Sequence, residues 1–430
     1  MNSLATQTGA ALSALVIAFG VSTAGAVPAQ AVPAPADVDR QVGWGAAWMA
    51  APQRASAGFE PNWSEEGFTG QSVRQVVRLT AGGSSLRIRL SNDYGPSAVR
   101  LTGATVAYPD HGASLQPASV RHLTFGHAGS ADIPAHGTLV SDPVRLRVRP
   151  LQPVAVTLYF AGTTGPATFH SQAYASSYRA QGDHRADTAA NAFTQATHSW
   201  YYLSGVDVSG EKKVSGEKKR DDAVVAFGDS ITDGFGSTGD ANNRYPDELA
   251  EYLATTGRAR PVLNAGIGGN LVLNDSAWYG DHSAARFQRD VLDQPGVGTV
   301  VMLEGVNDIG FSESDTPTYK PAPVVSADEL IAGYRRLIKQ AHAKDVKVVG
   351  ATLLPFKNSD HWGEHAATVS DAVNQWIRTS GEYDAVVDLD RGLAAPGDPD
   401  TLDPAFDSGD HLHPNDAGYA AMARLIAERL

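Results

Sequence analysis

The 430-residue sequence contains no cysteine. This absence excludes disulfide bonds, thiol nucleophiles, cysteine-ligated zinc and iron–sulfur clusters. The stability of the fold must therefore come from buried surface, and any nucleophile must be another residue type.

Basic charge is scarce and unevenly distributed. The formal net charge is -13; residues 221–430 contain 16 Lys and Arg against 33 Asp and Glu, whereas residues 40–208 contain 13 Arg, no Lys and 10 acidic residues. Attraction to phosphate groups requires clustered positive charge. We therefore expect no nucleic-acid partner, and no affinity for anionic membrane surfaces or polyanionic substrates.

Long apolar runs are also lacking. The run Ala11–Ala26 is interrupted by Ser, Gly and Thr and is shorter than the roughly 20 residues that a membrane-spanning helix needs. Ala24-Gly25-Ala26 and Ala29-Gln30-Ala31 suit a signal peptidase, although no Lys or Arg precedes Arg40. We predict a signal peptide at residues 1–31, a secreted, extracellular protein, and no stable membrane insertion.

The N-terminal half shows a strand-like period of two. In the stretch LRIRLS the leucines and the isoleucine are expected to face a core, and Arg87 and Arg89 to face water. Several short alternating runs with Gly, Pro, Asn and Asp between them are typical of an antiparallel β-sandwich, which we assign to residues 32–208. The candidate strands are Val73–Thr80, Leu86–Ser91, Leu139–Val148, Val154–Phe160 and Ser199–Val208.

A duplicated pentapeptide separates the two halves. SGEKK occurs at Ser209–Lys213 and again at Ser215–Lys219. A charged tract with few apolar residues cannot bury enough surface to fold by itself. We therefore interpret residues 209–222 as a linker between domains rather than as a recognition tract.

The C-terminal half, residues 223–430, alternates between strands and helices. Near-continuous Val, Ile and Leu runs between amphipathic helices indicate a three-layer, doubly wound (flavodoxin-like) parallel sheet covered on both faces. The candidate strands are Ala223–Phe227, Pro261–Gly266, Thr299–Gly305, Lys347–Leu354 and Ala385–Asp390; the candidate helices are 245–256, 327–344, 364–381 and 415–430.

Ligands of such sheets bind beyond the carboxyl ends of the strands. The residues that follow four predicted elements there are Gly228-Asp229-Ser230, 264–270, 304–308 and 410–415. Together these segments contain a nucleophile, backbone donors, an amide donor and an acid–base pair. Each segment alone is only a weak indication of a catalytic site. The occurrence of all four segments in this order is a much more specific indication.

These four segments resemble the sequence blocks of the SGNH hydrolases, a branch of the GDSL-type esterases and lipases. The resemblance covers 223–430 and implies that Ser230 is the nucleophile, that Gly269 and Asn307 match the second and third blocks, and that Asp410 and His413 form the last-block dyad. One departure is Ile231, which follows Gly-Asp-Ser where the family name has leucine.

Elementary chemistry agrees with these roles. A serine hydroxyl needs a neighbouring base, which His413 would provide, while Asp410 would fix the tautomer of the imidazole. The oxyanion formed by attack on an ester would be stabilised by the backbone N–H groups of Ser230 and Gly269 and by the side-chain amide of Asn307. Neither a metal nor an organic cofactor is expected.

Two other hypotheses involve histidines. His411 also lies near Asp410, and it is the resemblance that favours His413 as the base. His361-Trp362-Gly363-Glu364-His365 matches the H-x-x-E-H pattern of zinc proteases. We favour a loop entering a helix there, because Gly363 weakens a helix that would have to present both histidines.

Several residues beside the blocks have less defined roles. Asp229 and Asp308 are expected to stabilise the turns of their own blocks. The aromatic residues near the strand ends line an acyl or sugar pocket in one interpretation and pack in the core in the other: Phe235, Trp278, Tyr279 and Phe311.

The sequence therefore predicts a secreted serine esterase that acts through an acyl-enzyme. A β-sandwich joined to a secreted esterase favours an acylated carbohydrate, including an acylated polysaccharide, as substrate. A lipase or phospholipase acting on lipid or small acyl esters is the alternative. A non-catalytic glycan-binding protein is the alternative of another class.

Overall fold

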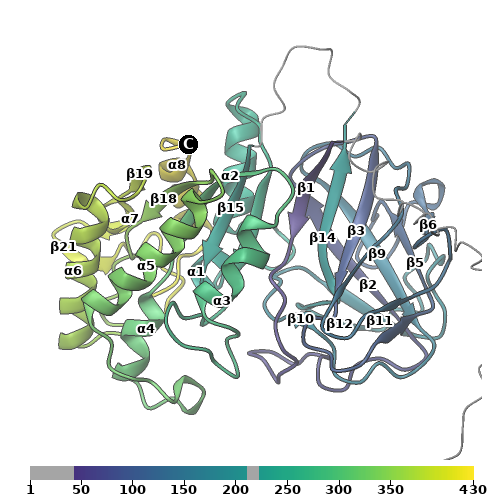
Figure 1. Ribbon diagram of the computed structural model, residues 1–430, viewed down its shortest axis with the longest axis horizontal. Coiled ribbons are helices and arrows are strands. Elements are labelled where there is room, and N and C mark those ends of the chain that lie inside the picture. Colours follow the sequence, from purple (N-terminus) through teal and green to yellow (C-terminus); the bar gives the residue numbers. More distant parts are fainter. Residues whose placement is uncertain (1–42, 211–221) are drawn as a thin grey trace, which may run out of the picture. The chain divides into compact units, whose positions relative to one another are not determined.

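The computed structural model describes residues 43–210 and 222–430 (Figure 1). Residues Gly43–Leu430 belong to one compact unit. The predicted signal peptide and most of the predicted linker lie outside the described residues. Those two assignments and the domain boundaries therefore stay predictions.

The N-terminal half consists of antiparallel β structure, as predicted. One sheet has the order β1-β14-β3-β8 and a second has the order β12-β11-β2-β9-β5-β6. The strands of the first sheet are β1 (Trp44–Met49), β14 (Leu203–Ser209), β3 (Ser85–Ser91) and β8 (Thr138–Val140). Those of the second are β12 (Gln195–Thr197), β11 (Ser177–Gln181), β2 (Gln71–Leu79), β9 (Gln152–Phe160), β5 (Gly103–Ala107) and β6 (Arg121–Leu123). Two short pairs complete this half: β4 (Val99–Leu101) with β7 (Ala131–Ile133), and β10 (Phe169–His170) with β13 (Trp200–Tyr201).

The hydrophobic core of this half is formed by apolar side chains that alternate with polar ones along the strands. Leu86, Ile88 and Leu90 on β3 are fully buried and share one hydrophobic cluster with Val73 on β2 and Val156 on β9. Both large sheets therefore contribute to a single core, because side chains on a strand alternate between its two faces.

Two sequence expectations for this half are corrected. Arg87 and Arg89 do not extend into water: each lies 3.1 Å from the buried carboxylate of Asp207 on the neighbouring strand β14. The predicted strand Leu139–Val148 is shortened to β8, with only isolated bridges at Val144 and Val148. Pro143 has no N–H to donate and so interrupts the ladder.

The C-terminal half contains a five-stranded parallel sheet of order β16-β15-β17-β18-β19. Its strands are β15 (Ala223–Gly228), β16 (Val262–Gly266), β17 (Val297–Leu303), β18 (Lys347–Ala351) and β19 (Ala385–Val387). Figure 1 shows these strands alternating with helices, in teal to yellow. The predicted parallel α/β fold is confirmed, and the strands carry little polarity because helices cover the sheet.

The helices form two packing groups. α2 (Tyr245–Thr255) and α7 (Leu389–Leu393) contact α8 (Asp416–Ala427), whereas α3 (Ser283–Phe287) and α6 (Glu364–Thr379) contact α5 (Ala327–His342). Two short helices follow strand ends, α1 (Ser230–Asp233) and α4 (Val306–Gly310), and a small hairpin joins β20 (Ala394–Ala395) to β21 (Asp398–Leu402). No helix within 43–210 or 222–430 has both the length and the apolar character needed to cross a membrane.

The two halves are in direct contact within the compact unit. The N–H of Ala46 on β1 donates to the carbonyl of Pro295 at 3.0 Å, and the N–H of Val262 on β16 donates to the hydroxyl of Thr80 at 3.1 Å. Ala46 and Met49 belong to the same hydrophobic cluster as the parallel sheet. The core of the α/β half is thus extended by an edge strand of the β half.

Candidate active site

The turn after β15 places Ser230 at the carboxyl end of the sheet. β15 ends at Gly228, and Asp229 caps the short helix α1 by accepting the N–H of Ile231 at 3.0 Å. Asp229 therefore stabilises the turn, as expected. Ser230 is the first residue of α1 and is only 6% exposed.

Ser230, His413 and Asp410 form a continuous chain of hydrogen bonds. Ser230 Oγ lies 2.7 Å from His413 Nε2, and His413 Nδ1 lies 2.6 Å from Asp410 Oδ2. The other carboxylate oxygen of Asp410 accepts the N–H groups of Leu412 at 3.0 Å and of His413 at 2.8 Å. The same carboxylate thus holds both the imidazole ring and the backbone that carries it.

The charge state of Asp410 fixes the direction of these hydrogen bonds. Burial alone would raise the pKa of Asp410, but the hydrogen bond and charge of His413 bring that pKa well below its ordinary value. Asp410 is therefore a carboxylate and accepts from His413 Nδ1–H. His413 Nε2 is left free to accept the hydroxyl proton of Ser230, as a general base must.

His411 points elsewhere. Its Nδ1 lies 2.7 Å from Asp407 Oδ2, and its side chain is about half exposed. Of the two histidines that the sequence places near Asp410, only His413 reaches Ser230. The geometry therefore agrees with the choice of His413 over His411.

The predicted oxyanion donors lie on the same cavity, which has a volume of about 320 Å³. Gly269 has a φ of 73°, and a Cβ there would lie 2.4 Å from the ring of Tyr279, so no other residue fits without displacement. Asn307, on α4, is 2% exposed, and its Nδ2 donates to the carbonyl of Asn270 at 3.0 Å. Ser230, Gly269, Asn307, Asp410 and His413 all line this cavity.

A comparison with known protein families gives a match in the C-terminal half, which contains the predicted site residues. Residues 226–421 match the model of the GDSL-like lipase/acylhydrolase family. The match covers slightly less than half of the chain and includes all five predicted site residues. The predicted enzyme class, a carboxylic ester hydrolase, is confirmed at the level of this acylhydrolase family.

Solved structures similar to this chain cover about half of it. A putative acylhydrolase from Bacteroides fragilis is 21% identical over 50% of this chain and 89% of its own, with a TM-score of 0.37. An acetyl xylan esterase is 23% identical over 48% and 98% respectively, with a TM-score of 0.36. An acetyl xylan esterase from Geobacillus stearothermophilus is 23% identical over 48% and 93%, also with a TM-score of 0.36. Likenesses of this degree do not indicate which ester this chain cleaves, and no curated protein matches the chain.

Asp308 was expected to stabilise the turn of its own block, but it holds the loop that follows the second block. Its carboxylate accepts the N–H groups of Val272 at 2.8 Å and of Leu273 at 3.1 Å, just beyond the second block. Burial raises the pKa of Asp308 to about 7, although these two hydrogen bonds oppose the shift. Asp308 thus ties the second block to the third rather than stabilising its own turn.

Residues of the β half also line the catalytic cavity, and the sequence did not predict their presence there. Phe59 and Gln172 line the cavity beside Ser230. Both lie outside regular strands, in segments without periodicity, so no sequence signal marked them.

A buried ion pair links the β half to the oxyanion loop. His170 Nε2 lies 3.0 Å from Asp233 Oδ1, and Asp233 Oδ2 accepts the N–H of Gly268 at 3.0 Å. Burial alone would lower the pKa of His170, but the charge of Asp233 and the hydrogen bonds raise it above its ordinary value. A residue of the β half therefore fixes the backbone immediately before Gly269.

Three of the four aromatic residues singled out in the sequence line the cavity. The ring centroid of Phe235 lies 4.3 Å from that of His413, and Tyr279 packs 5.4 Å from Phe311. Trp278 instead lines an adjacent cavity of about 210 Å³, where it is 38% exposed. Phe59 and Tyr279 border both cavities.

The zinc-protease hypothesis for 361–365 does not hold. α6 begins at Glu364, so His361 precedes the helix and the two histidines do not share a helix face. His365 Nε2 lies 3.0 Å from the carbonyl of Val325, while His361 lines the catalytic cavity. The segment is a loop entering a helix, as favoured from the sequence.

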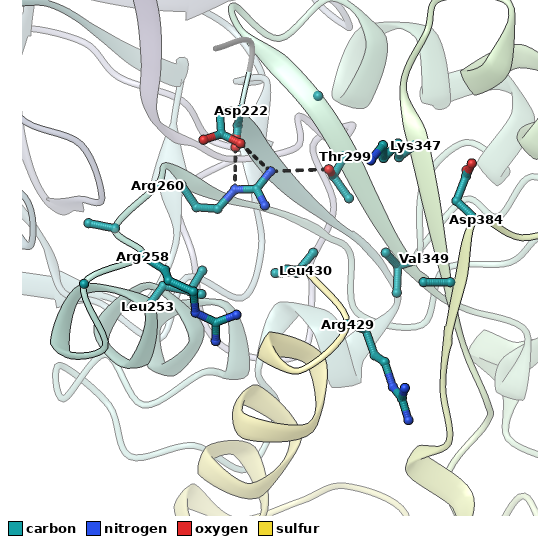
Figure 2. Close-up of a pocket in the computed structure, with 14 residues that line it drawn as sticks. Asp222, Leu253, Arg258, Arg260, Thr299, Lys347, Val349, Asp384, Arg429 and Leu430 are labelled. Atoms are coloured by element: carbon teal, nitrogen blue, oxygen red, sulfur yellow. Dashed lines mark hydrogen bonds and ion pairs between the residues drawn. The ribbon is translucent and has the colours of Figure 1, made fainter.

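A larger cavity of about 730 Å³ lies at the opposite, amino-terminal edge of the parallel sheet (Figure 2). Its lining includes Lys347 at the start of β18 and Arg260, which is paired with Asp222 at 2.8 Å and with Thr299 at 3.3 Å. None of the predicted site residues lines it. The catalytic residues and this cavity therefore occupy different ends of the strands.

Replacing the two neighbouring histidines separately tests the assignment of the base. His413→Ala is expected to lower kcat for ester hydrolysis by at least about 10³-fold, because Ser230 loses its proton acceptor. His411→Ala is the matched control and is expected to stay within about threefold of the wild type, since surface changes are usually mild. Equal losses in the two variants would contradict the assignment.

Proposed function

We propose that the protein hydrolyses carboxylic esters through an acyl-enzyme on Ser230. The observation that carries this proposal is the chain from Ser230 Oγ through His413 to Asp410, with distances of 2.7 and 2.6 Å. It lies on a cavity that also contains Gly269 and Asn307. The match of residues 226–421 to the GDSL-like lipase/acylhydrolase family supports the same reaction class.

The acylation step follows from this geometry. As Ser230 Oγ bonds to the carbonyl carbon, His413 Nε2 takes the hydroxyl proton, and the carbonyl electrons move to oxygen. Asp410 stabilises the imidazolium that forms. When the tetrahedral intermediate collapses, the bond to the alcohol oxygen breaks and His413 gives its proton to that oxygen. The alcohol leaves, and the acyl group remains on Ser230.

Deacylation repeats the same steps with water. His413 takes a proton from a water molecule as its oxygen attacks the acyl carbon, and it returns the proton to Ser230 Oγ as the acid leaves. In both steps the oxyanion is bound by the N–H groups of Ser230 and Gly269 and by the amide of Asn307. Loss of one such donor typically lowers kcat by about 10² to 10³-fold.

We propose an acylated carbohydrate as the substrate. The volume of about 320 Å³ is at the lower end of the range for ligand pockets, which suits a short acyl group with one adjoining ring. Phe59, which is 46% exposed, lines this cavity, and Trp278, which is 38% exposed, lines the adjacent one. Both rings offer flat faces on which sugar rings stack. We also propose that the enzyme acts outside the cell, as the apolar N-terminal run suggests.

Gln172 supports a carbohydrate substrate over a lipid one. Its side-chain oxygen is buried and has no hydrogen-bond partner in the part of the chain that the structure describes. A buried acceptor without a donor costs about 1–3 kcal/mol. A sugar hydroxyl would supply the donor, whereas an acyl chain would not. Lipid or small acyl esters remain the alternative because five aromatic side chains also line the cavity: Phe59, Phe235, Tyr279, Phe311 and Tyr319.

Replacing the nucleophile tests the reaction. Ser230→Ala is expected to lower the turnover of p-nitrophenyl acetate to near the uncatalysed rate, because no acyl-enzyme can form. Ser312→Ala is the matched control: its hydroxyl donates to the carbonyl of Ile309, away from the cavity lining. Equal rates for wild type and Ser230→Ala would overturn the proposed function.

Replacing Gln172 tests the substrate class. Gln172→Met keeps the length of the side chain and removes its polar atoms. The ratio of kcat/KM for an acetylated xylo-oligosaccharide to that for p-nitrophenyl acetate is expected to fall about tenfold, the value of one hydrogen bond of about 1.4 kcal/mol. An unchanged ratio, or a wild type that prefers long-chain esters, would favour the lipid alternative.

A further inference from the structure

A second Asp–His pair lies in the catalytic cavity. His361 Nδ1 is 2.6 Å from Asp360 Oδ1, and His361 Nε2 is 3.1 Å from the side-chain oxygen of Asn307. The ring of His361 is 2% exposed, and both members of the pair line the cavity with Ser230. The catalytic chain through His413 does not use this pair.

The hydrogen bonds of Asn307 determine which atom faces His361. Asn307 Nδ2 donates to the carbonyl of Asn270, which can only accept. The atom of Asn307 that faces His361 is therefore the oxygen, which also can only accept. His361 Nε2 must carry a hydrogen and donate it.

The other nitrogen of His361 carries a hydrogen as well. It faces Asp360, whose pKa lies below its ordinary value, chiefly because of the hydrogen bond with His361. Asp360 is therefore a carboxylate and can only accept. With acceptors at both nitrogens, His361 makes both hydrogen bonds only by donating at each nitrogen.

The surroundings of His361 contain few other charges. Phe311 and Tyr319 approach its ring edge-on at 5.6 and 5.5 Å, and Gly310 packs against it closely. Burial raises the pKa of Tyr319 above its ordinary value, so its hydroxyl is neutral; it donates to Asp360 Oδ2 at 3.3 Å. His413 also acts on the charge of Asp360.

We propose that His361, held by Asp360 at Nδ1 and donating from Nε2, is a positioning residue that fixes and polarises the Asn307 amide for oxyanion binding. Asn307 Nδ2 has two hydrogens, of which one is used on Asn270. The second is available to the cavity, where the oxyanion forms. A hydrogen bond donated to the amide oxygen draws electrons toward that oxygen and makes the free N–H a stronger donor.

This inference rests on the proposed ester hydrolysis and adds a residue outside the four sequence blocks to it. The competing explanation is that His361 only fills space between Phe311 and Tyr319. The two explanations differ in whether the effect of His361 passes through Asn307.

A double-mutant cycle separates them. His361→Phe keeps a flat ring and removes both donors, and Asn307→Ala removes the amide. In the wild-type background His361→Phe is expected to lower kcat for p-nitrophenyl acetate by about 10 to 10²-fold, with KM within about threefold. This loss is smaller than that expected from removing an oxyanion donor altogether, because the Asn307 amide is still present. In the Asn307→Ala background the same change is expected to cost less than about threefold.

Two milder variants cover the case in which His361→Phe does not fold. His361→Gln keeps a donor that can reach Asn307, and it is expected to recover part of the lost kcat. Asp360→Asn, at a half-exposed side chain, removes the carboxylate that accepts from His361 Nδ1. It is expected to lower kcat for p-nitrophenyl acetate by about threefold to tenfold, with KM within about threefold.

The outcomes are distinguishable. Equal losses from His361→Phe in both backgrounds, or no loss from His361→Phe or Asp360→Asn, would overturn the inference while leaving Ser230-dependent hydrolysis intact. Absence of Ser230-dependent hydrolysis in the wild type would overturn the proposed function and this inference together. A kcat loss confined to the background that contains Asn307 supports the proposal.

Discussion

The hydrogen bond between Ser230 Oγ and His413 Nε2 is the contact on which the functional account depends. It joins two residues that are 183 positions apart in the sequence and requires that His413 accept at Nε2. The carboxylate of Asp410 meets that requirement by accepting at the opposite nitrogen. Ser230 follows β15 at the carboxyl end of the parallel sheet, and His413 reaches it from the loop between β21 and α8.

The loops at this edge are held largely by aspartates, which explains part of the acidic excess of the C-terminal half. Asp229 caps the nucleophile turn, Asp233 holds the N–H of Gly268, Asp308 ties two blocks together, and Asp410 binds the backbone of its own loop. Irregular loops leave backbone N–H groups without partners, and a buried carboxylate can accept several of them. The His361–Asp360 pair extends this pattern to the side chain of Asn307.

The sequence predicted the parallel fold, and its strand ends located Ser230, Gly269 and Asn307. The order of the four sequence blocks added Asp410 and His413, which follow the β20–β21 hairpin rather than a strand of the parallel sheet. The sequence did not predict Phe59 and Gln172, which line the cavity from irregular segments of the β half, or His170, which contacts Asp233 from the short strand β10; all three depend on how the two halves pack. In the sequence His361 stands out only as one end of an H-x-x-E-H pattern, because nothing local links it to Asn307. Arg87 and Arg89 show an alternating pattern, but they pair with the buried Asp207 of β14, which is far away in the sequence and neighbours β3 in the sheet.

The most direct test of the central claim is covalent labelling with a fluorophosphonate, which bonds to an activated serine and releases fluoride. Peptide mass spectrometry of the wild type is expected to find the phosphonyl group on the peptide containing Ser230. Under the same conditions His413→Ala is expected to remain unlabelled, because its serine hydroxyl has no base. Labelling at another residue, or equal labelling of Ser230 with and without His413, would contradict the account.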